Sequence, residues 1–123
     1  MLISTMFSSK AQNYFDVSVV NNTSCTIDVE VEASPGVFLF TASVPGGGGT
    51  TSATCVSGIP ANIRFLEGAN FMVMPPNGGN QNCGGGSSVC GGSCFPTANF
   101  FTSYSLVGPA CGGTKYNLII TIN

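Results

Sequence analysis

The sequence has no histidine, no tryptophan and few charged side chains of either sign. Of its 123 residues, three are Lys or Arg and five are Asp or Glu, so 7% are charged and the net charge at pH 7 is −2. Three cations cannot form the basic surface that binds phosphate backbones. Without histidine, the commonest general base is missing. We therefore expect no nucleic-acid partner, no cofactor and no enzyme activity.

The residues that remain do not assemble a catalytic motif either. Glycoside hydrolysis needs two carboxylates on either side of the bond, and only Glu67 lies apart from a cluster between Asp16 and Glu32. The glycine runs 46–49 and 84–86 are not followed by Lys and Ser or Thr, as a phosphate-binding loop requires. No apolar run is long enough for a transmembrane helix.

Two neighbouring stretches alternate apolar and polar residues, and they set the fold class. The first is 14–20, the second is 26–32, and an Asn- and Ser-rich break at Asn21–Ser24 separates them. A period of two places one set of side chains in a core and the other in water, which is typical of half-buried β-strands. Asn, Ser and Thr favour turns. If the two strands pair as an antiparallel hairpin, Asp16 falls opposite Asp28 or Glu30.

Further extended runs follow, separated by Gly and Pro turns. They are 37–44, 50–56, 62–67, 71–74, 95–107 and 116–122. No window shows a helical period with caps. The pattern predicts an all-β fold, an immunoglobulin-like β-sandwich of about seven or eight strands, in a single domain over residues 12–123. Because Val37–Phe40 is apolar on both faces, we expect a central position for that strand.

Six cysteines in so short a chain indicate a disulfide framework in an oxidising compartment. They are Cys25, Cys55, Cys83, Cys90, Cys94 and Cys111. The alternative is a zinc site formed by the last four, although only Cys90 and Cys94 have the close spacing of zinc ligands. The sequence does not fix the pairing; a bond between Cys25 and Cys55, both near strand ends, would suit two packed sheets.

Residues 75–94 differ from the rest, with many glycines, three cysteines and almost no apolar side chains. We expect a long, disulfide-stapled Gly-rich loop, because loops of this length are functional or mobile unless they are crosslinked.

The first residues resemble the end of a secretory signal peptide. Met1–Phe7 is a short apolar run, and small residues lead to a cleavage point after Ala11. We interpret 1–11 as the remnant of such a signal whose basic start is missing; the alternative is a disordered or strand-forming N-terminus. The expected location is secreted or cell surface.

Two clusters are candidate sites. The acidic residues Asp16, Asp28 and Glu30 offer carboxylates to Ca²⁺, or they form a solvated face that opposes aggregation. The second cluster offers amides and a phenol to a sugar or small ligand, or it is a core with an inert loop. Its residues are Asn80, Asn82, Asn99 and Tyr104.

The segment 14–29, with Ser9–Gln12 before it, resembles small, mostly uncharacterised secreted β-domain proteins of Bacteroidota-type bacteria. That resemblance implies export and a β domain and assigns no site residues. We therefore expect an exported, non-enzymatic structural or adhesive surface module. Its expected partners are further copies of itself or a surface protein or glycan. The alternative is a glycan- or small-ligand-binding domain that uses region 77–104.

Overall fold

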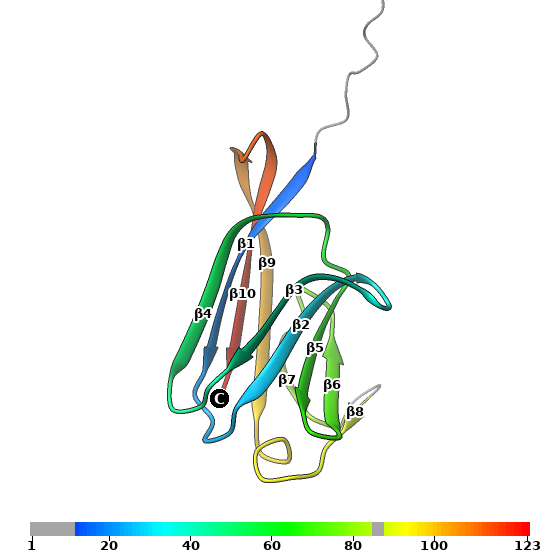
Figure 1. Ribbon diagram of the computed structural model, residues 1–123, viewed down its shortest axis with the longest axis vertical. Helices are drawn as coiled ribbons and strands as arrows, with labels where there is room; N and C mark the ends of the chain where they lie inside the picture. Colours follow the sequence, from blue (N-terminus) through cyan, green and yellow to red (C-terminus); the bar gives the residue numbers. More distant parts are fainter. Residues whose placement is uncertain (1–11, 85–87) are drawn as a thin grey trace, which may run out of the picture.

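The computed structural model describes residues 12–84 and 88–123, which form an all-β structure (Figure 1). The strands are β1 (Asn13–Asn21), β2 (Ile27–Ser34), β3 (Val37–Val44), β4 (Gly49–Ser57), β5 (Asn62–Glu67), β6 (Asn70–Met74), β7 (Gly79–Asn82), β8 (Ser88–Val89), β9 (Asn99–Ala110) and β10 (Gly113–Ile122). Two of them, β7 and β8, lie in the region predicted as a loop, which raises the number of strands above the seven or eight expected. The predicted signal remnant 1–11 lies outside the described residues. Within the described ranges, no helix is long and apolar enough to cross a membrane.

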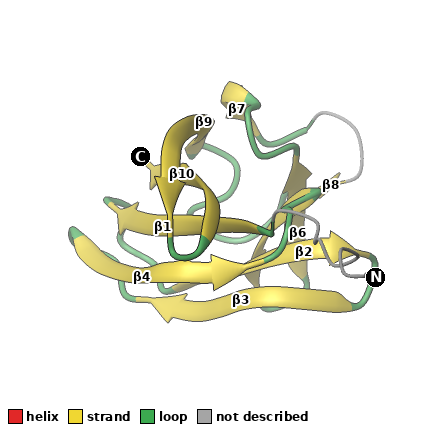
Figure 2. Ribbon diagram, turned by 90° about the horizontal axis from the view of Figure 1, so that it is seen from above, coloured by secondary structure: helices red, strands yellow, loops and turns green. Residues whose placement is uncertain are grey.

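The strands form two five-stranded sheets that pack face to face (Figure 2). Sheet A has the order β4-β1-β10-β9-β7, and sheet B has the order β3-β2-β5-β6-β8. Among the described strands, every pairing is antiparallel except that of β1 with β10, which is parallel. The predicted β-sandwich is confirmed at this level.

The first two strands do not form the hairpin that the sequence would allow. β1 pairs with β4 and β10 in sheet A, whereas β2 pairs with β3 and β5 in sheet B. The chain crosses from one sheet to the other directly after Asn21, which is fully buried. Its Nδ2 donates to the carbonyl oxygens of Cys25 (2.7 Å) and Val44 (2.9 Å), and its Oδ1 accepts from the backbone N–H of Thr23 (3.0 Å). Alternation indicates which side chains point inward, but it does not identify the neighbouring strand.

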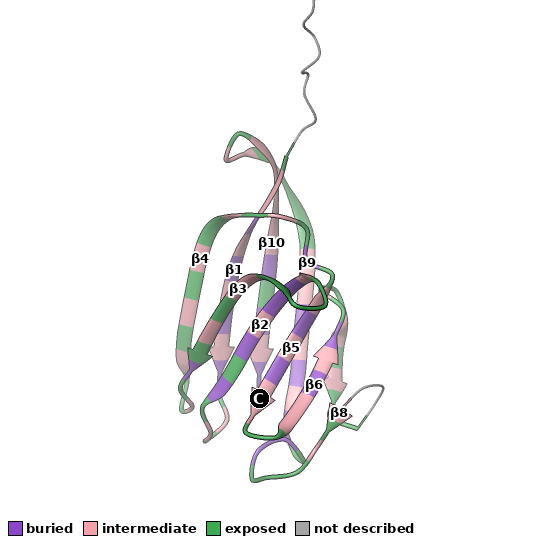
Figure 3. Ribbon diagram, turned by 45° about the vertical axis from the view of Figure 1, so that its right-hand side comes forward, coloured by how far each residue is buried: buried purple, intermediate pink, exposed green. Residues whose placement is uncertain are grey.

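The core lies between the two sheets, and the alternating residues of both supply it (Figure 3). The fully buried large side chains are Phe15, Val17, Ile27, Ile63, Phe65, Met72, Met74, Phe95, Phe100, Leu118, Ile120 and Ile122. Phe65 of sheet B contacts Phe100 of sheet A, with ring centroids 4.8 Å apart. The predicted periodicity is therefore confirmed in both sheets.

Three disulfides crosslink the fold, and they use all six cysteines. The pairs are Cys25–Cys94, Cys55–Cys111 and Cys83–Cys90. The suggested pair Cys25–Cys55 is wrong, because the two cysteines lie at opposite ends of the sandwich. Cys25 follows the end of β1, whereas Cys55 lies beside its start, and a nine-residue strand spans about 30 Å.

The strand expected at the centre lies at an edge. β3 pairs only with β2 and is the first strand of sheet B. Consequently Val37 and Phe38, apolar residues that suit a covered strand, are 51% and 49% exposed. The prediction of a central position is wrong for the described chain.

Candidate functional site

The residues predicted to bind Ca²⁺ do not come together. Asp16 lies on β1 of sheet A, whereas Asp28 and Glu30 lie on β2 of sheet B. Asp16 accepts a hydrogen bond from the backbone N–H of Cys55 (3.0 Å), and its other oxygen pairs with Lys115 Nζ (2.9 Å). These two interactions, the first being the larger, lower the pKa of Asp16 below its ordinary value.

The acidic residues of β2 also have structural partners. Arg64 of β5 lies 3.3 Å from Glu30 and 3.8 Å from Glu32, which is only 4% exposed and also accepts from the N–H of Gly36. Over residues 12–84 and 88–123, no group of three His, Cys, Asp or Glu side chains is arranged to hold a metal ion. The carboxylates of Glu30 and Glu32 therefore make contacts within sheet B and its β2–β3 turn, on the outer face of the sheet.

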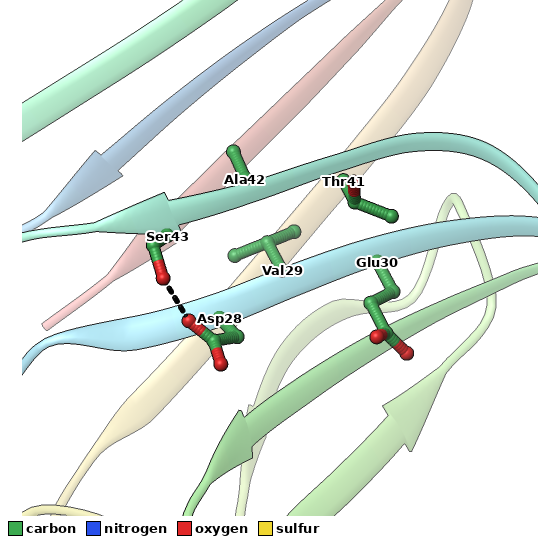
Figure 4. A pocket seen from close by; sticks show the side chains of 6 residues that line it. All are labelled: Asp28, Val29, Glu30, Thr41, Ala42 and Ser43. Atoms are coloured by element: carbon green, nitrogen blue, oxygen red, sulfur yellow. Dashed lines mark hydrogen bonds between the residues drawn. The ribbon is translucent and has the colours of Figure 1, made fainter.

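A shallow hollow lies on that face between β2 and β3 (Figure 4). Its volume is about 360 Å³, and its lining residues are Asp28, Val29, Glu30, Thr41, Ala42 and Ser43. Ser43 donates a hydrogen bond to Asp28, while the Glu30 side chain extends from β2 away from β3, toward β5. The hollow is open and has few polar groups that converge on one point, so it does not define a small-molecule site.

The predicted sugar-binding residues are divided between two faces of sheet A. In the register of β7 and β9, Asn80 pairs with Phe101 and Asn82 with Asn99, and all four are on the outer face, opposite to Phe100 and Thr102. Asn99 Nδ2 donates to Asn82 Oδ1 (3.2 Å). These three amides thus form a small outward-facing group.

Tyr104 does not belong to this group, because it lies on the inner face. Its ring stacks on Tyr116 of β10, with centroids 4.7 Å apart and an interplanar angle of 9°. Burial raises the pKa of the Tyr104 hydroxyl, and its Oη has no hydrogen-bond partner among the described residues. Its main role is to extend the packing between the sheets.

All six thiols are consumed in disulfides, which overturns the zinc alternative, since zinc binds the thiolate form of cysteine. The chain matches no known protein-family model, no curated protein and no solved structure.

Sequence reasoning missed one surface, the side of the sandwich formed by β3 and β4, which we call the β3–β4 side. These two strands are the outer strands of the two sheets and lie next to each other in space (Figure 2). Neither contains a charged residue or a proline. An edge strand presents unpaired N–H and C=O groups, and such an edge can accept another strand. The signal in the sequence was the apolar run Val37–Phe40, read as a covered strand.

Proposed function

We propose that the protein is an exported, non-enzymatic structural or adhesive module that works at or outside the cell surface. The observation that carries this proposal is the distribution of the three disulfides. One joins the crossover after β1 to the loop before β9, the second joins β4 to the tip of the β9–β10 hairpin, and the third joins the residues that follow β7 and β8. Disulfides of this kind persist in oxidising compartments.

These crosslinks favour a role in which the domain resists unfolding. The two long-range bonds close loops of 69 and 56 residues. By restricting the unfolded chain, each in isolation raises the free energy of unfolding by about 4 kcal/mol. With so few charges, the surface offers little electrostatic attraction to an ionic substrate and little repulsion against neutral neighbours. Both properties suit a durable surface component better than a freely diffusing catalyst.

The location is tested by alkylating intact cells that produce the protein, followed by mass spectrometry without reduction. We expect the protein outside the cytoplasm, cleaved after Ala11, with all six cysteines oxidised. A cytoplasmic protein whose thiols all react with the alkylating reagent would overturn the proposal.

An immunoglobulin-like relationship, and kinship with secreted β-domain proteins of Bacteroidota-type bacteria, belong to the same proposal. They are supported by two packed sheets in which all pairs but β1 with β10 are antiparallel, and by the sequence around Asn21–Cys25.

A second candidate function is glycan binding, and the outward amides Asn80, Asn82 and Asn99 favour it. They lie together at the β7 edge beside Phe101, and amides with an adjacent aromatic face are suited to sugar hydroxyls. In a glycan array, saturable binding that is lost in Asn82→Ala but retained in the distant Asn62→Ala would favour this candidate. No saturable binding to any glycan would remove it.

A further inference from the structure

β3 has the sequence of a covered strand and the position of an uncovered one. It is eight residues long, carries no charge, and begins with two large apolar side chains that are about half exposed. From Phe40 to Val44 it pairs with β2 without interruption, so its other side presents a regular row of backbone groups. β4 starts next to that stretch and is regular from Gly49 to Ala53. This combination is what natural edge strands avoid.

The other edges of the described sandwich are limited by length or interruption. β7 has four residues and β8 has two. The part of β9 beyond Thr102 extends past β7, but it contains Gly108 with φ of 139° and Pro109, which has no N–H to donate. The far end of β4 is bulged opposite Asp16 and crosslinked at Cys55. Over residues 12–84 and 88–123, the β3–β4 side is the one that offers two long, regular, adjoining strands.

We propose that the β3–β4 side binds a second copy of this chain. In the complex, β3 pairs antiparallel with β3 of the other copy across a two-fold axis at Ala42, which joins the two B sheets into one continuous sheet. This inference rests on the proposed structural function and names its partner. A two-fold interface uses the same patch on both copies, so the patch must be compatible with itself. A charge-free strand meets that condition, because no like charges come into opposition.

Charge also distinguishes a second copy from other partners. An acidic or basic partner would find no complementary charge on β3 or β4. Elsewhere on sheet B, two copies would bring Asp28 and Glu30 near the same residues of the other molecule. The β3–β4 side is thus the long edge where copies of this acidic protein meet without repulsion.

The size of the surface predicts a weak complex. With the axis at Ala42, residues 40–44 of the two strands overlap over about 17 Å, and two sheets about 10 Å apart with their side chains give a side about 20 Å wide. Each copy then buries about 350 Å², and the pair about 700 Å², which is below the size of most stable interfaces. We expect a dissociation constant of about 100 μM, so that association dominates only where the protein is concentrated at a surface.

The test compares two variants of equal charge in the oxidised chain. In Thr41→Lys/Ser43→Lys, each new lysine lies beside Glu30 or Asp28 of its own sheet, which the monomer tolerates, but faces a lysine of the other copy across the axis. The control Thr121→Lys/Ser103→Lys places the same charges on the outer face of sheet A, away from β3. Sedimentation velocity over a concentration series should show association that the first variant weakens about tenfold and the control leaves unchanged. Hydrogen exchange should show protection of 37–44 that rises with concentration in the wild type.

A monomer at all concentrations, or equal association of the two variants, would overturn the inference. Thermal unfolding of both variants verifies that each is folded. A monomeric protein that is nevertheless exported with its disulfides formed would leave the proposed function in place, so the two failures are distinguishable.

Discussion

The two open sides of the sandwich end in different ways. On the β7–β8 side, the outer strands have four and two residues, and a disulfide between Cys83 and Cys90 joins the residues that follow them. On the β3–β4 side, the outer strands have eight and nine residues, and nothing in the described chain covers β3. Neither side uses charged residues, the commonest protection of an edge. In a charge-poor protein, therefore, an edge is closed by short strands and covalent bonds or is left for another chain.

The largest expected effect comes from removing the crosslinks one at a time. Loss of Cys55–Cys111, which holds β4, should lower the free energy of unfolding by about 4 kcal/mol, because it closes a loop of 56 residues. Loss of Cys83–Cys90, with a separation of seven, should cost about 2 kcal/mol. The measurement is chemical denaturation of the paired alanine variants. Equal losses would mean that loop length does not set the contribution of these bonds.

A smaller effect is expected where the chain enters β7. Thr102 of β9 is fully buried; its Oγ1 accepts from the N–H of Gly78 (2.8 Å) and donates to the carbonyl oxygen of Pro75 (2.9 Å). Thr102→Val keeps the shape but leaves both backbone groups without a partner, which costs about 2 kcal/mol. The control is Thr121→Val on the outer face of the neighbouring strand, expected to change stability by less than about 0.5 kcal/mol.

Hydrogen exchange distinguishes a local from a global role for Thr102. If the valine variant loses protection at 78–82 while the rest of sheet A is unchanged, the hydroxyl holds β7 alone. A stability equal to that of the wild type would show that water satisfies the two backbone groups, and that the β7–β8 side depends on its disulfide only.

What could be predicted from the sequence follows from the range of each signal. Side-chain alternation is local, so the inward positions of β1, β2 and β10 were predictable from the residues alone. Strand neighbours and disulfide pairs are long-range, and the crossover after Asn21 depends on a buried amide that bonds a carbonyl 23 residues away. Val37–Phe40 shows the same limit: its composition indicates a covered strand, and only the sheet order reveals that β3 is an edge strand among the described residues.

The carboxylates illustrate how this limit affected the candidate sites. Placing Asp16 opposite Asp28 or Glu30 required β1 and β2 to be neighbours. With the strands in different sheets, Asp16 contacts Lys115 and the N–H of Cys55, Glu30 contacts Arg64, and Asp28 accepts from the hydroxyl of Ser43. The three carboxylates therefore do not share a site. The amide group Asn80, Asn82 and Asn99 did come together, because its members lie on two strands that are adjacent in sheet A.

The smallest expected effect is a pH dependence of the folding stability that Asp16 contributes beside the far end of β4. The N–H of Cys55 and, second, the ammonium of Lys115 hold the pKa of Asp16 below its ordinary value. A lowered pKa in the folded state means that the unfolded chain binds the proton more readily, so this stabilisation is complete above about pH 4 and is lost as the pH falls through the folded value. Asp16→Asn should reduce the loss of stability in acid. Lys115→Ala should retain most of that loss, because the hydrogen bond from Cys55 is the larger cause of the lowered pKa. Unfolding measured from neutral pH to about pH 2 checks this order, and an equal effect of both variants would assign the shift to the ion pair instead of to the backbone of the edge strand.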